Sequence, residues 1–232
     1  MVPFGEAHAA VYDRQFEKIS TVRDAVHLGA RLGLDRLPEK ARILCVGAGT
    51  GEDALRLGAA HPNWHFQLTD PAPAMLAIAR QRLEAAGLLD RCSFHDGFLD
   101  SLPQSAPFDG ATALLVSHFL TSLDERTQFF RDIAGRLAPG GTLVCADLAA
   151  DRAAPDFRSV MDLWLAGLRL CDLPAENLAS YDDAFGRDFA AHTPAQLEQA
   201  ITDAGFTPPV QAFQALLIRV YVARKLQAGL TA

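Results

Sequence analysis

The sequence lacks several features that would place it in a membrane or secreted class. No stretch approaches the roughly 18 uninterrupted apolar residues of a membrane span, and no charged segment followed by an apolar one begins the chain. We therefore expect a cytoplasmic protein with no membrane segment. Cysteine is scarce and forms no C-x-x-C pair, which predicts buried thiols in a reducing compartment; the four are Cys45, Cys92, Cys145 and Cys171.

Positive charge is also scarce. The chain has 21 Lys and Arg against 28 Asp and Glu, a formal net charge of -7. This balance argues against a broad nucleic-acid surface and favours small, neutral or cationic substrates. Its seven histidines form no metal pattern, because Pro62 interrupts the i, i+4 spacing of His61 and His65, so we expect no metal site.

Short apolar runs alternate with helical stretches through the first two thirds of the 232 residues, with no internal repeat or linker. Strict alternation requires crossover connections, which predicts an α/β fold with a doubly wound, mostly parallel sheet covered on both faces. The expected strands are 43–46, 65–69, 93–95, 110–116 and 142–147, and the expected helices are 52–60, 72–86 and 124–137. Pro139-Gly140-Gly141 is expected to end the last of these helices.

The two ends of the chain differ from this alternating part. Residues 8–36 have helical periodicity and predict an N-terminal helical cap over a ligand cleft. Helices are expected at 156–171 and 194–204, and strands at 211–214 and 217–223 are close enough to form a hairpin at the sheet's edge. We therefore divide the chain into a cap (1–36) and a main domain (37–232) with a helical insertion at about 150–195.

Three glycines on alternate positions follow the first strand. Gly47, Gly49 and Gly51 allow a sharp strand-to-helix turn and a close approach of backbone to a bulky ligand. The spacing is G-x-G-x-G rather than G-x-G-x-x-G, and Glu52 and Asp53 follow at the helix start, where two acids repel phosphate. The loop thus favours a cationic ligand such as S-adenosylmethionine (SAM) over NAD, although a tight turn without a ligand is the alternative.

Acidic residues end the next two strands. Asp70 stands 19 positions beyond Gly51, close to the offset at which an acid holds ribose hydroxyls; the alternative is a helix N-cap. Asp96 ends the third strand, where it could accept from the adenine amine, with Gly97 allowing close approach and Phe98 packing on the purine. Ordinary turn chemistry is the alternative there.

Combined, these motifs make the chain similar to class I SAM-dependent methyltransferases over residues 40–150. The resemblance rests on the glycine loop, on Asp70 with the Pro-Ala-Pro-Ala-Met-Leu that follows, and on Pro139-Gly140-Gly141. It implies a Rossmann-like sheet of seven strands with an antiparallel strand near one edge, and SAM as cofactor. It places the cofactor against Gly47, Gly49, Gly51, Glu52, Asp70, Asp96, Gly97, Phe98 and Ser117.

One position departs from the family pattern. Many members carry an acid two positions before the first glycine, where it helps to hold the amino group of SAM, and this chain has Cys45 there. The resemblance then leaves three alternatives for that role: Glu52, Asp53, or waters held by backbone carbonyls.

Methyl transfer depends mainly on positioning, so few side chains need to be catalytic. His118, after the fourth strand, is our candidate general base for a hydroxyl nucleophile; a histidine packed at a strand end is the alternative. His95 and His192 are weaker candidates. The expected function is methylation of an unidentified small molecule.

Two other functions stay open. The chain also resembles carboxy-SAM synthase, but Asp182 aligns with that enzyme's carboxylate-binding arginine, and Arg187 lies out of register with it. A non-enzymatic SAM-binding module is the other alternative. Apolar helix faces in the N-terminal and inserted segments would also be consistent with a homodimer.

Overall fold

A computed structural model describes residues 17–171, 178, 181–184, 187–190 and 192–227. It contains one seven-stranded sheet in the order β3-β2-β1-β4-β5-β7-β6, in which β7 runs opposite in direction to the other six strands. The strand order reverses between β1 and β4, which is where open α/β sheets bind ligands. The strands are β1 (Arg42–Val46), β2 (His65–Asp70), β3 (Cys92–Asp96), β4 (Phe108–Leu114), β5 (Leu137–Leu148), β6 (Val210–Ala215) and β7 (Ile218–Arg224).

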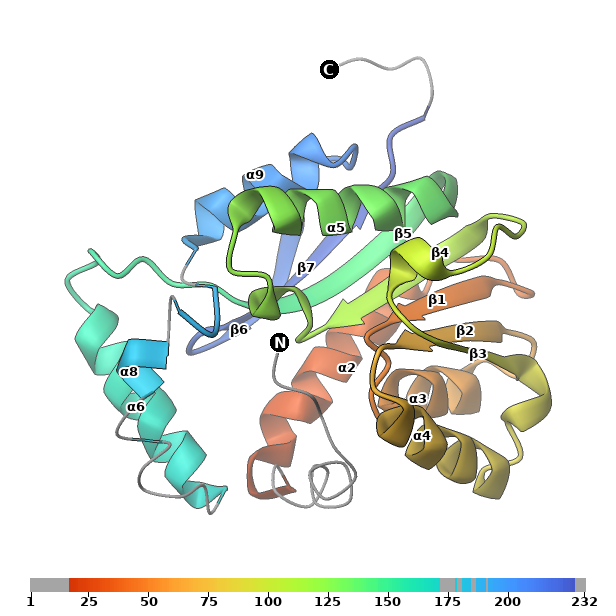
Figure 1. Cartoon of the computed structure of the whole chain (residues 1–232), viewed down its shortest axis with the longest axis horizontal. Helices are drawn as coiled ribbons and strands as arrows, with labels where there is room; N and C mark the ends of the chain where they lie inside the picture. The colour runs from red at the N-terminus through yellow and green to blue at the C-terminus, as the bar shows by residue number, and fades with distance from the viewer. Residues whose placement is uncertain (1–16, 172–177, 179–180, 185–186, 191, 228–232) are drawn as a thin grey trace.

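Helices cover both faces of the sheet, as predicted (Figure 1). One face carries α2 (Ser20–Leu34), α3 (Glu52–Ala60) and α4 (Pro73–Ala85), and the other carries α5 (Leu123–Arg136) and α9 (Pro194–Asp203). The helices α6 (Phe157–Leu170) and α8 (Tyr181–Ala184) lie beyond the carboxyl end of β5. Single turns are η1 (Glu17–Ile19), η2 (Leu89–Arg91), η3 (Leu99–Ser101) and η4 (Ser117–Phe119).

The apolar side of α2 packs directly on the sheet. Val26, Ala30 and Leu34 are buried there, and a Cβ at Gly33 would lie only 2.6 Å from Val144 of β5. The predicted N-terminal helix is therefore present over residues 20–34. Residues 1–16 of the predicted cap lie outside the described residues, and the division into cap and main domain stays a prediction.

The region around Pro139-Gly140-Gly141 differs from our prediction. Helix α5 does end nearby, at Arg136, but the tripeptide lies inside β5, which begins at Leu137. Gly140 has a φ of +78° and donates its N–H to the carbonyl of Lys225, while Gly141 accepts from the Lys225 N–H. Strand pairing with the chain after β7 therefore extends β5 through a segment that by composition looked like a loop.

Strand β4 also ends earlier than predicted. We expected it to run to Val116, but it stops at Leu114 because Leu115 adopts a φ of +60°. A left-handed leucine costs about 1–2 kcal/mol. Its N–H is held by the carbonyl of Ala146 at 2.7 Å. This turn directs the chain into η4, next to the glycine loop.

The other expected elements are confirmed to within a few residues, including the hairpin of β6 and β7. All four cysteines are free, and all but Cys92 are buried. Among the described residues, no helix is both long and apolar enough to cross a bilayer.

Candidate functional site

The three loop glycines all have positive φ, at +62° for Gly47, +53° for Gly49 and +79° for Gly51. Their surroundings differ. A Cβ at Gly47 would lie 2.6 Å from Val116, and one at Gly51 would lie 3.0 Å from the Cβ of Ala79, so both serve internal packing. A Cβ at Gly49 would meet no protein atom within 4 Å. The loop therefore has one glycine that faces open space, as a cofactor approaching the backbone requires.

Asp70 ties the loop to the next strand. Its Oδ2 accepts the Gly49 N–H at 2.8 Å and its Oδ1 accepts the Ala72 N–H at 2.8 Å. Burial raises the pKa of this carboxyl, and the two backbone hydrogen bonds partly oppose that rise. The helix N-cap that we considered as the alternative role is wrong, because Ala72 is the N-cap residue of α4, and Asp70 instead holds the turn before that helix. This role leaves each oxygen a second lone pair, so the carboxylate can still accept from a ribose hydroxyl.

Asp96 lies beside Asp70, because the two residues are paired in the parallel register of β2 and β3. The Gly97 N–H donates to the Asp70 carbonyl at 3.1 Å, and the Phe98 side chain is 54% exposed. A Cβ at Gly97 would lie 2.7 Å from Ser101 Oγ and 3.0 Å from His95 Nε2. Local packing alone thus requires this glycine, and adenine contacts at all three positions stay predictions.

We had expected Glu52 to present a free negative charge at the start of α3. In the structure, two arginines compensate that charge. Burial disfavours the ionisation of Glu52, but hydrogen bonds from Arg56 and Arg82 outweigh this and lower its pKa to about 2. Arg56 Nε lies 2.6 Å from Oε1, and Arg82 Nη2 contacts Oε2 while Nη1 donates to the carbonyl of Thr50. Glu52 and Arg82 therefore brace the loop, and the sequence argument that both acids repel phosphate is wrong for Glu52.

Asp53, the next residue, lies in a different environment. It is 8% exposed, and its Oδ2 accepts from the Thr112 hydroxyl at 2.6 Å. Thr112 is the strand partner of Cys45, so this carboxylate lies under the glycine loop between α3, β1 and β4.

The turn η4 carries Ser117 and His118 into a buried polar network. His118 Nδ1 is 3.1 Å from Asp147 Oδ1 at the end of β5, and the Ser117 hydroxyl donates to Asp147 Oδ2. Burial raises the pKa of Asp147, but the Arg126 charge and the His118 hydrogen bond dominate and lower it to about 2. Asp147 is therefore ionised and accepts, so His118 carries its proton on Nδ1 and leaves Nε2 as a proton acceptor.

Arg126 of α5 holds this network together. It is fully buried, with Nη2 3.0 Å from Asp147 Oδ2 and Nη1 3.0 Å from His192 Nδ1. Its Nε and Nη2 also donate to Ser117 Oγ at 3.1 and 3.0 Å. The Ser117 hydroxyl is thus engaged inside the protein, which does not support the cofactor contact that we predicted for it.

The other two histidines have local roles. Because arginine only donates, His192 accepts from Arg126, and burial together with that charge lowers the pKa of His192. His95 Nε2 contacts Ser101 Oγ at 2.9 Å. Of these three histidines, the described side-chain contacts pair only His118 with a carboxylate.

Sequence reasoning did not single out Asp147 or Arg126. Asp147 carried a usable signal, because it ends an apolar strand as Asp70 and Asp96 do. Arg126 carried none, since one arginine in a polar helix is indistinguishable from its exposed neighbours.

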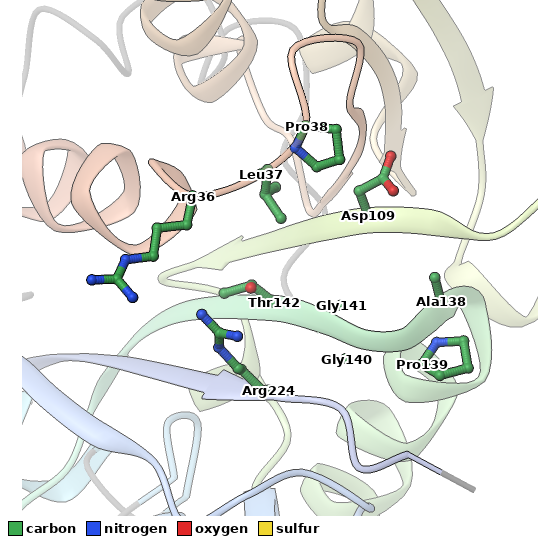
Figure 2. Close-up of a pocket in the computed structure, with 10 residues that line it drawn as sticks. All are labelled: Arg36, Leu37, Pro38, Asp109, Ala138, Pro139, Gly140, Gly141, Thr142 and Arg224. Carbon is green, nitrogen blue, oxygen red and sulfur yellow. The ribbon is translucent and has the colours of Figure 1, made fainter.

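A separate cavity of about 210 Å³ lies at the other end of the strands from the glycine loop, near the amino ends of β4 and β5 (Figure 2). Arg36 and Arg224 point toward one another there, and Asp109 also lines it. Asp109 accepts the Arg42 N–H at 2.8 Å. The cavity is thus unrelated to the glycine loop. Among the described residues, no group of three or more His, Cys, Asp or Glu could hold a metal ion.

Comparisons with known proteins agree with this architecture. Residues 43–141 match the family model described as a methyltransferase domain. An O-methyltransferase of Aspergillus nomiae is 31% identical over 140 residues, covering 60% of this chain and 59% of its own. A demethylmenaquinone methyltransferase of Thermus thermophilus is 36% identical over 115 residues, covering 49% of each chain. The chain thus spans about half to three fifths of these two relatives.

Among solved structures, CalO1, a methyltransferase in calicheamicin biosynthesis with S-adenosylhomocysteine (SAH) bound, superposes with a TM-score of 0.64. It is 18% identical, and the match covers 94% of this chain and 58% of that one. At this identity the likeness shows the fold alone. Residues 43–141 thus match a methyltransferase domain, and the sheet order and glycine loop around them show the fold of class I SAM-dependent methyltransferases.

Proposed function

We propose that the protein transfers the methyl group of SAM to a small-molecule acceptor and that His118 is its general base. The observation that supports this most strongly is the contact between His118 Nδ1 and the buried, ionised Asp147. A histidine that served only for packing would not need a buried carboxylate to fix its tautomer.

Position supports the same proposal. Val116, directly before η4, lies against Gly47, where an added Cβ would approach it to 2.6 Å. The turn that carries His118 is therefore adjacent to the loop that would hold SAM. The Ala190 N–H donates to the His118 carbonyl at 2.7 Å. This bond fixes η4 from the side of the inserted segment, next to Phe119 and Phe189.

When bound, SAM would supply an activated methyl on a sulfonium. Transfer of that methyl to an acceptor oxygen would release SAH and would require removal of the hydroxyl proton. His118 Nε2 takes the hydroxyl proton, and Asp147 stabilises the resulting imidazolium. Gly49 and Asp70 would position the nucleoside, and Asp96 with Phe98 the adenine. The chain's contribution is then alignment plus one proton transfer.

No observation favours the alternatives. Arg187 is exposed and paired with Asp188, and the side chain of Asp182 lies outside what the structure describes. The acceptor, a homodimer and a cytoplasmic location stay predictions.

Isothermal titration with SAM and with SAH tests the proposal directly. We expect saturable binding of both, and incubation with labelled SAM and a cell extract should transfer label to a small molecule. An Asp70→Ala variant should lose both properties. Absence of binding in the folded wild-type protein would reject the proposal, and binding without transfer would indicate a sensor.

A further inference from the structure

The amino-acid end of SAM carries an ammonium group, which needs a carboxylate if it is held away from water. We propose that Asp53 binds this ammonium group and that the neighbouring acid, Glu52, does not. This inference rests on the proposed function and adds to it the residue that recognises one end of the cofactor.

Charge balance separates the two acids. Glu52 has an arginine on each oxygen, Arg56 on Oε1 and Arg82 on Oε2, so its charge is already compensated. Asp53 receives a side-chain hydrogen bond from a neutral hydroxyl, that of Thr112, and a backbone hydrogen bond from its own N–H. Among the described residues, no side-chain hydrogen bond reaches its Oδ1.

Among the described residues, His27 of α2 is the basic side chain in ionic contact with Asp53. Its Nδ1 lies 3.9 Å from Asp53 Oδ1, beyond hydrogen-bond distance. Burial lowers the pKa of His27, although the Asp53 charge opposes this. Burial thus disfavours the charged form of both groups, and among the described residues Asp53 has no cationic partner within hydrogen-bond distance. A cation that reached Oδ1 would remove this penalty.

The position of Asp53 suits the role. It lies in the first turn of α3, directly after the glycine loop, and Thr112 fixes the orientation of its carboxylate. The side chain is 11% exposed, so the protein does not enclose the carboxylate completely. Cys45 lies beside it, and burial followed by the Asp53 charge raises the thiol's pKa well above its usual value. Cys45 is therefore neutral and leaves the negative charge at this end of β1 to Asp53.

The test compares two ligands on two variants. SAH carries the amino group, and deaminated SAH lacks only that group. We expect the wild-type protein to bind SAH at least tenfold more tightly, because a hydrogen bond between charged groups is lost with the amine. In Asp53→Asn this preference should fall to about twofold, with little change in affinity for the deaminated ligand. Glu52→Gln, the matched control, should keep the wild-type preference even if its thermal stability falls.

Each result decides between the hypotheses. If wild-type protein shows no preference, or Asp53→Asn keeps it, the assignment to Asp53 is overturned while the proposed function stands. If wild-type protein binds neither ligand, the proposed function itself fails. Should Asp53→Asn not fold, Thr112→Val releases the carboxylate from its hydroxyl and should reduce the preference severalfold; an unchanged preference in that variant also overturns the assignment.

Discussion

A single contact, between His118 Nδ1 and Asp147 Oδ1, decides which nitrogen of the imidazole can take a proton. Replacing His118 by Gln removes the base but keeps a polar side chain of similar length. We expect methyl transfer to a hydroxyl acceptor to fall by about 10²–10⁴-fold, with the Kd for SAM changed less than about threefold. Single-turnover assays with labelled SAM, once an acceptor is found, measure the rate.

The control for that experiment is His65→Gln, at an exposed position at the amino end of β2. It should transfer methyl groups at the wild-type rate. If His118→Gln also retained a rate within twofold of wild type, His118 would be a packing residue and not the base.

Asp147 should also make the protein sensitive to acid. Its pKa in the folded state is about 2, against about 3.9 in an unfolded chain. Because the folded value is the lower one, its contribution is complete above about pH 4 and is lost as the pH falls toward 2. The free energy of unfolding should therefore fall more steeply between pH 4 and 2 in wild type than in Asp147→Asn. Urea denaturation across this range measures both slopes, and equal slopes would contradict the assignment.

Individual site residues were predictable where a strand end or a glycine marked them. Asp70 and Asp96 end their strands as expected, because the end of an apolar run is visible in sequence. The pairing of Glu52 with Arg82 was not predictable, since it joins α3 to α4 across 30 positions. Such partners depend on how helices pack, and no local pattern encodes that.

The glycine loop offers a matched pair of substitutions. Gly49 and Gly87 both have positive φ, at +53° and +68°, and neither Cβ would meet a protein atom within 4 Å. Gly49→Ala and Gly87→Ala should each lower the free energy of unfolding by about 1–2 kcal/mol. Only Gly49→Ala should weaken SAH binding, by tenfold or more, because its Cβ would occupy the space assigned to the cofactor. Equal SAH affinities in the two variants would show that Gly49 does not face the ligand.

Elements with a regular pattern were predicted well, and their junctions were not. The alternation of apolar runs with helices predicted the parallel sheet correctly because its central strands, β1, β4 and β5, are largely buried. The composition of Pro139-Gly140-Gly141 predicted a loop, but these residues belong to β5 because Gly140 and Gly141 form backbone hydrogen bonds with Lys225. The predicted end of β4 was also wrong, because Leu115 has a left-handed backbone that no local sequence preference would predict.

Arg126 connects parts of the chain that are distant in sequence: α5, the end of β5, and the segment at His192. Removing it leaves the buried Asp147 uncompensated, so Arg126→Met should lower the free energy of unfolding by about 3–5 kcal/mol. The double variant with Asp147→Asn should lose less than the sum of the two single losses. Urea denaturation at pH 7 measures all three.

Arg131→Met is the control for this series, because Arg131 lies on the same helix with an exposed side chain. It should change stability by no more than about 0.5 kcal/mol. If the losses for Arg126 and Asp147 were additive instead, the two residues would not act as one unit.

The strand that comes last in the sequence, β7, does not lie at the edge of the sheet. β7 lies between β5 and β6, so β6, although synthesised earlier, has no neighbour in the sheet until β7 has emerged from the ribosome. Val220 and Tyr221, near the end of the chain, then complete the core on opposite faces of the sheet. Because translation proceeds from the N-terminus, the loop and the strand-end acids can assemble while β6 still waits for its partner. Translation that stops before residue 218 would therefore yield a chain with a glycine loop but with the outer side of β5 uncovered.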